Sequence, residues 1–168
     1  MPQNDQALRM RLKAGNLDFV VIGGVCVVYH GAPLATFDLD ICCPFGVENV
    51  QKIEAAVQDL HPVHRLTAHK LPLEETRSSF GDLKNLCLQT DLGKLDFLSE
   101  VKGVGDYGEV LRCSVIAELS YGKFRFLSLE ALIVAKEAVG RDRDLDALKF
   151  LRVFKEKLDQ QPNLKFNS

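Results

Sequence analysis

The amino-acid sequence predicts an α+β fold, in which a mixed β-sheet is flanked by helices and followed by a C-terminal helical pair. In the first 60 residues, short β-branched runs alternate with segments whose apolar residues recur at helical spacing. Two pairs of apolar runs follow over 86–98 and 114–127, each divided by a short turn that is typical of a β-hairpin. Only helical patterns come after them, which predicts the closing pair of helices.

Size and composition indicate a folded globular chain. With 168 residues, 46% hydrophobic and 26% charged, the chain is long enough for one domain with a small helical appendage. We divide it into an α/β core over 1–127 and a helical extension over 128–168, packed on the core as one compact unit. The apolar runs, such as 19–22, are far too short to span a bilayer, and no secretion signal is visible, so we expect a cytoplasmic protein without a membrane partner.

Charge and cysteine content exclude other classes. A net charge of −2 argues against a protein that coats polyanions, although a local basic patch stays open. Five cysteines, an odd number without a Cys-x-x-Cys pair, read as buried small hydrophobes. The histidines His61, His64 and His69 lie in an aperiodic stretch, so exposed loop residues are a better interpretation than a zinc site.

The first half of the chain has four regular segments around a pair of glycines. A helix over 5–14 ends at Gly15, and the β-branched run 18–22 predicts a buried strand that ends at Gly23 and Gly24. Segment 25–30 fits a strand or a buried helix, and we favour the helix because the strand over 35–42 must then return beside the first. An apolar stripe over 47–60 predicts the next helix.

The second half begins with an irregular stretch over 61–84, which we expect to be a loop with one short strand. Strands over 86–89 and 94–98, a Gly-rich link over 103–108, and a hairpin of 114–119 with 123–127 follow. Ser128 is the expected N-cap of a helix over 129–139 that ends at Gly140. Asp142 caps or opens the last helix, and the tail from Gln160 is expected to fray.

The strand over 35–42 carries the candidate chemistry. Side chains on a strand alternate, so Thr36, Asp38, Asp40 and Cys42 share one face, with Phe37, Leu39 and Ile41 on the other. Two carboxylates held this close repel each other unless a cation lies between them, which suits a divalent metal ion. An exposed strand with acids on its wet side is the alternative. Asp96, on the strand over 94–98, is a third carboxylate that can lie beside the first two.

The order of these features resembles the DNA polymerase β-like nucleotidyltransferase superfamily. Its pattern is a Gly-Gly turn, about a dozen residues, an Asp-x-Asp strand and a third acid on a neighbouring strand; here 13 residues separate Gly24 from Asp38. Segments 126–136 and 141–146 resemble the helical end of the minimal, abortive-infection toxin-type members, with Arg143 where those relatives have Lys. The resemblance covers roughly residues 18–150.

The resemblance implies a magnesium-dependent nucleotidyltransferase that moves a nucleoside monophosphate from a nucleoside triphosphate to a hydroxyl acceptor. The implied catalytic and metal residues, for a two-metal site, are Asp38, Asp40 and Asp96. The implied nucleotide-binding residues are Gly23, Gly24, Thr36, Lys136, Arg141 and Arg143. The acceptor is an RNA end, a protein or a small molecule, and an antitoxin-like protein is an implied partner.

One position departs from the pattern of the superfamily. Many relatives carry an Arg two residues before the Thr of the acidic strand, and this chain has Leu34 there. Arg65, Lys70 or Arg77 from the irregular stretch is a possible replacement, and weakened activity is the other explanation. A non-catalytic nucleotide-binding or interaction module of the same fold is therefore the alternative function. A metal-dependent phosphodiesterase is a third, which the Gly-Gly turn before the acids disfavours.

Overall fold

Seven strands form one mixed sheet in the computed structural model, which describes residues 3–161. The strand order is β3-β4-β5-β2-β1-β9-β8. Two neighbouring pairs, β2 with β5 and β1 with β9, run parallel, and the other pairs run antiparallel. The strands are β1 (Val20–Ile22), β2 (Asp38–Cys42), β3 (Val63–His64), β4 (Asn85–Thr90), β5 (Gly93–Leu98), β8 (Ser114–Leu119) and β9 (Gly122–Leu127). The α+β class predicted from the sequence is confirmed.

Helices and one small ribbon complete the chain. The ribbon pairs β6 (Glu100–Val101) with β7 (Gly105–Asp106). The α-helices are α1 (Asp5–Ala14), α2 (Gly23–Tyr29), α3 (Val47–Val57), α4 (Tyr107–Arg112), α5 (Leu129–Val139) and α6 (Leu145–Gln160). The 3-10 helices are η1 (Gln58–Leu60), η2 (Leu73–Asp82) and η3 (Asp142–Asp144).

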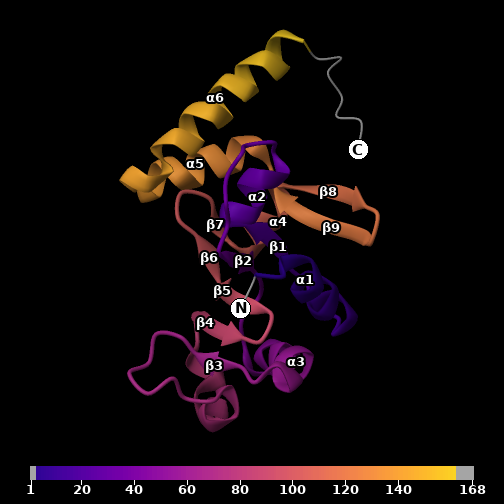
Figure 1. The fold of residues 1–168 in the computed structure, drawn as a ribbon, viewed down its shortest axis with the longest axis vertical. Helices are drawn as coiled ribbons and strands as arrows, with labels where there is room; N and C mark the ends of the chain where they lie inside the picture. The colour runs from indigo at the N-terminus through magenta and orange to yellow at the C-terminus, as the bar shows by residue number, and fades with distance from the viewer. Residues whose placement is uncertain (1–2, 162–168) are drawn as a thin grey trace.

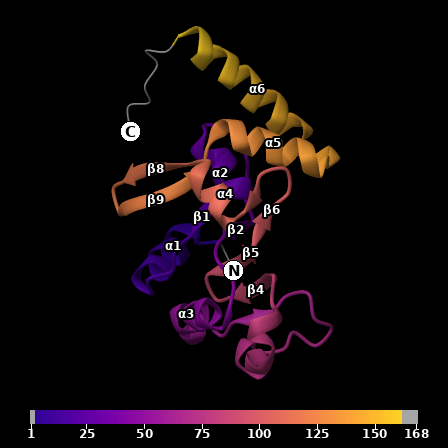
Figure 2. The same ribbon diagram turned by 180° about the vertical axis from the view of Figure 1, so that it is seen from behind.

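Two groups of helices lie toward opposite ends of the molecule, and α1, α2 and α4 lie between them. In Figure 1, α5 and α6 lie together at one end, and α3 with the segment around β3 lies at the other; the reverse view in Figure 2 agrees. Ser128 caps α5 by accepting a hydrogen bond from the Ala131 N–H, and Gly140 ends it in the left-handed conformation. The predicted C-terminal helical pair is therefore present. Within residues 3–161, no helix is both long and apolar enough to cross a membrane.

The central strands are buried on the face opposite the acids. Leu39 and Ile41 of β2 and Leu95 and Phe97 of β5 are fully inaccessible to solvent. Because the side chains of a strand alternate, this burial fixes which face of the sheet carries the residues between them. The core thereby directs Asp40 and Asp96 to the other side of the sheet.

Several predicted boundaries were wrong. The acidic strand begins at Asp38 rather than at 35, and Phe37, expected against the core, is 73% exposed. The link over 103–108 contains β7 and the start of α4, whose first turn is capped by Asp106. Stretch 61–84 contains the expected short strand, β3, and the unpredicted helix η2. Most of the tail expected to fray lies outside the described residues.

Candidate active site

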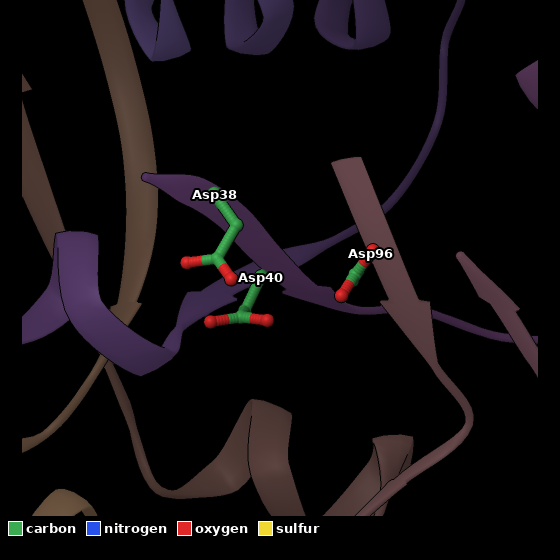
Figure 3. Close-up of side chains that lie close together, drawn as sticks. All are labelled: Asp38, Asp40 and Asp96. Carbon is green, nitrogen blue, oxygen red and sulfur yellow. The ribbon is translucent and has the colours of Figure 1, made fainter. Parts of the chain in front are cut away.

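Three carboxylates converge on one face of the sheet. The parallel register of β2 and β5 places Asp40 directly beside Asp96, and Asp38 lies two residues earlier on the same face of β2. One oxygen from each of the three side chains lies within 4.8 Å of the others. Figure 3 shows Asp38 and Asp40 leaving one strand and Asp96 the next, with a carboxylate oxygen of Asp96 directed toward Asp40.

Asp40 lies in surroundings that disfavour its charged form. Burial, followed by the negative charges of Asp38 and Asp96, raises the pKa of Asp40 to about 6. A hydrogen bond from the Gly24 N–H and the positive charge of Lys136 act in the opposite direction. The three carboxylates therefore repel one another, and a cation between them would relieve the repulsion.

The paired glycines make room for this cluster. Gly23 has a left-handed φ of +62°, and a Cβ there would collide with the Asp40 carboxylate, at 2.7 Å from its Cγ. A Cβ on Gly24 would lie 3.0 Å from the Cγ2 methyl of Thr36, which is half-buried. Glycines are thus required at this turn because β1 passes into α2 directly beside Asp40, where a side chain would not fit.

Arg65 reaches the acids from outside the core strands. Its Nη2 donates a hydrogen bond to Asp96 Oδ2, forming an ion pair whose side chains are 26% and 14% exposed, respectively. Arg65 was named from the sequence as a possible replacement for the cation missing at Leu34, which is 41% exposed. The other two candidates lie elsewhere, because Arg77 pairs with Glu54 at 2.6 Å and Lys70 is exposed.

The predicted phosphate-binding cations of the C-terminal helices differ in their surroundings. Lys136 donates to Asp144 Oδ1 at 2.6 Å in a largely buried pair that ties α5 to η3, and its charge also acts on Asp40. Arg141 and Arg143 are exposed, and no ion pair to either is found within residues 3–161. Lys136 is therefore the one of the three whose charge reaches the carboxylates.

Two residues around the candidate site were missed in the sequence. Asp144 is the partner of Lys136, and Cys87 lies directly across from Asp96 in the β4–β5 ladder. Burial and the Asp96 charge raise the pKa of the Cys87 thiol to about 11. The position of Cys87 could have been predicted from the hairpin register, because a short turn between two strands fixes which residues face each other.

The donor set fits a hard divalent cation. Carboxylate oxygens are the ligands that magnesium prefers in proteins, and magnesium needs only one or two of them besides phosphate and water. Asp96 Oδ1 is buried and has no hydrogen-bond partner, so it is available as a ligand. Among residues 3–161, no other group of at least three His, Cys, Asp or Glu side chains gathers in this way. The histidines, for example, bond elsewhere, with His61 on Asp91 and His64 on Thr76.

The family model described as a nucleotidyl transferase of unknown function (DUF2204) matches residues 5–166, and the chain belongs to this family. No curated protein sequence is significantly similar to the chain.

Solved structures share the fold at low sequence identity. The lincomycin-bound lincosamide antibiotic adenylyltransferase LnuA superposes with a TM-score of 0.58 at 15% identity, over 90% of this chain and 98% of that one. ANT(2″)-Ia in complex with adenylyl-2″-tobramycin gives 0.54 at 14% identity, over 93% and 95%. A nucleotidyltransferase-like protein from Paracoccidioides brasiliensis gives 0.50 at 13%, over 96% and 91%. These likenesses confirm the nucleotidyltransferase fold.

Proposed function

We propose that the chain is a magnesium-dependent enzyme that transfers a nucleoside monophosphate from a nucleoside triphosphate to a hydroxyl acceptor. The observation that supports this most is the convergence of Asp38, Asp40 and Asp96 within 4.8 Å at the point where the glycine turn approaches β2. Membership of a nucleotidyl transferase family supports the reaction class, and the three acids form the site that we propose for it.

In this proposal, Asp38, Asp40 and Asp96 hold one or two magnesium ions. When bound, magnesium supplies charge neutralisation on the attacking and leaving oxygens of an in-line displacement. The acceptor oxygen forms a bond to the α-phosphorus, the bond from that phosphorus to the β-phosphate bridging oxygen breaks, and pyrophosphate leaves. The acceptor proton passes to the Asp96 carboxylate.

Several residues are proposed to bind the triphosphate. Gly23 and Gly24 let it approach the backbone closely, and Thr36 lies beside Gly24 to bond a phosphate oxygen. Lys136, Arg141 and Arg143 neutralise the phosphates and the departing pyrophosphate. Since Asp144 already pairs with Lys136, the exposed Arg141 and Arg143 have the freer side chains for this role.

Two of the structural neighbours act on or bind antibiotics, so we place small hydroxyl compounds first among the acceptors to be tested. An RNA end and a protein hydroxyl come next. An antitoxin-like partner and a cytoplasmic location stay predictions from the resemblance.

A transfer assay tests the proposal. The full-length protein is given each α-³²P-labelled nucleoside triphosphate with magnesium, and separately RNA, protein and small-molecule fractions of a cell extract. We expect label in one fraction, released pyrophosphate, and a loss of about 10³-fold or more in Asp38→Asn and Asp40→Asn. If nucleotide raises the melting temperature only with magnesium and label never transfers, the protein is a binding module instead. Labelled monophosphate released into water without an acceptor would indicate a phosphodiesterase.

A further inference from the structure

A row of four polar side chains crosses the sheet and ends at Arg65. Asp40 of β2 lies beside Asp96 of β5, and Asp96 lies across from Cys87 of β4. The Arg65 N–H donates to the Cys87 carbonyl at 2.9 Å, which extends the ladder one residue beyond β3. Arg65 therefore approaches the acids from a fixed backbone position, although it belongs to the irregular stretch 61–84.

The ion pair between Arg65 and Asp96 leaves one buried atom without a partner on each side. Arg65 Nη2 bonds Asp96 Oδ2, whereas Arg65 Nε and Asp96 Oδ1 are both buried and unpartnered. A buried polar atom without a hydrogen bond is unfavourable, and such atoms are rare in folded proteins. The pair therefore leaves one buried polar atom of each side chain without a hydrogen bond, and Oδ1 of Asp96 is left for another cation.

We propose that Arg65 is the built-in counter-ion of Asp96, so that a divalent ion must share this carboxylate with the guanidinium. Arg65 thereby makes ion binding depend on the nucleotide. This inference rests on the proposed function. A guanidinium beside the carboxylate lowers its attraction for a free cation. A triphosphate that arrives with the ion brings negative charge of its own, which Arg65 attracts. Arg65 is thus a positioning residue that disfavours the free ion and favours the ion–nucleotide complex.

The test measures binding of manganese, a spectroscopic substitute for magnesium, to the full-length protein by electron paramagnetic resonance. We expect Arg65→Gln and Arg65→Met to bind free Mn²⁺ about tenfold more tightly than wild type, because a nearby positive charge is gone. Arg65→Lys, which keeps the charge, should stay within about threefold of wild type. Lys70→Gln is the matched control, because it removes an equal charge from an exposed side chain of the same stretch, and its Mn²⁺ affinity should not change.

A second titration includes a non-hydrolysable nucleoside triphosphate analogue. The analogue should increase Mn²⁺ affinity by a larger factor in wild type than in Arg65→Gln, since only the wild type has the guanidinium to couple the two ligands. This difference between factors is a readout that a merely structural role of Arg65 would not produce.

The inference is overturned if both neutral variants, folded by circular dichroism, bind free Mn²⁺ as weakly as wild type or more weakly. The two neutral variants differ in their packing, because Met keeps an apolar stem and Gln a polar end, so misfolding of one leaves the other to decide. The Asp40→Asn variant separates this inference from the proposed function. If wild type and the Arg65 variants do not bind Mn²⁺, or if the Asp40→Asn substitution does not abolish their binding, the metal site itself is absent.

Discussion

Strands β2 and β5 present opposite kinds of side chain on their two faces. One face is fully buried in the core and the other carries the carboxylates: Leu39, Ile41, Leu95 and Phe97 against Asp38, Asp40 and Asp96. The apolar face stabilises the sheet by removing hydrocarbon surface from water. The acidic face opposes folding, because burial and mutual repulsion raise the pKa of Asp40.

This contrast shows how the fold holds an unfavourable cluster in place. The register that pairs Leu39 with Leu95 and Ile41 with Phe97 also sets Asp40 beside Asp96. A slip of one residue would bury the acids and expose the core residues, so the apolar face specifies the geometry of the acidic face. Stability and the proposed chemistry therefore reside on opposite sides of the same two strands.

Leu39→Ala tests the buried face of the sheet, and we expect it to have the largest effect on stability. Leu39 is completely buried, so its truncation should lower the free energy of unfolding by about 2–5 kcal/mol. The neighbouring Asp40→Asn should leave that free energy unchanged or raise it, because it removes a repelling charge and keeps an acceptor for the Gly24 N–H. Urea denaturation of the metal-free proteins measures both. Equal destabilisation by the two substitutions would refute the division of roles.

Gly23→Ala should disturb the acidic face directly. Its Cβ would collide with the Asp40 carboxylate, and the left-handed φ disfavours any side chain, so we expect a loss of about 1–3 kcal/mol. Gly24→Ala is the matched control, because it meets only the Thr36 methyl at 3.0 Å, and its cost should be smaller. Thermal and urea unfolding of both variants compare them. If Gly24→Ala costs as much or more, crowding at Asp40 is not what requires the glycine turn.

The pH dependence of stability should reveal the burial and repulsion of Asp40, with an effect no larger than that of Gly23→Ala. The pKa of this carboxyl rises from its ordinary 3.8 to about 6 on folding, so its stabilising contribution is fully present below about pH 4. That contribution is lost as the pH rises through about 6. In chelator, wild type should therefore lose about 1–3 kcal/mol relative to Asp40→Asn between pH 4 and 7.5. Parallel pH profiles of the two proteins would contradict the shift.

Much of the fold could be predicted because the decisive patterns are local. The hairpin of 114–119 with 123–127, the Ser128 cap and the Gly140 end of α5 all depend on residues close in sequence, and the structure has them. The strand over 94–98 also lies beside the acidic strand, as proposed.

The failures have physical causes in tertiary structure. Residues 35–37 extend the alternating pattern of the acidic strand, but the ladder with β5 begins only at Asp38 and the ladder with β1 only at Asp40, which leaves Phe37 outside the sheet. Helix α4 follows two glycines, which hid its short apolar pattern. The ion pair of Arg65 with Asp96 joins residues 31 apart through the β3–β4 ladder, and an aperiodic stretch gives no sign of that register.

A manganese soak of crystals of the full-length protein tests the central claim most directly. Anomalous scattering locates manganese without reference to activity. We predict a peak between the strands β2 and β5, ligated by oxygens of Asp38, Asp40 and Asp96, and its absence in crystals of Asp40→Asn. A wild-type crystal that binds manganese only elsewhere, or not at all with the nucleotide analogue present, would contradict the assignment of these three carboxylates as a metal site.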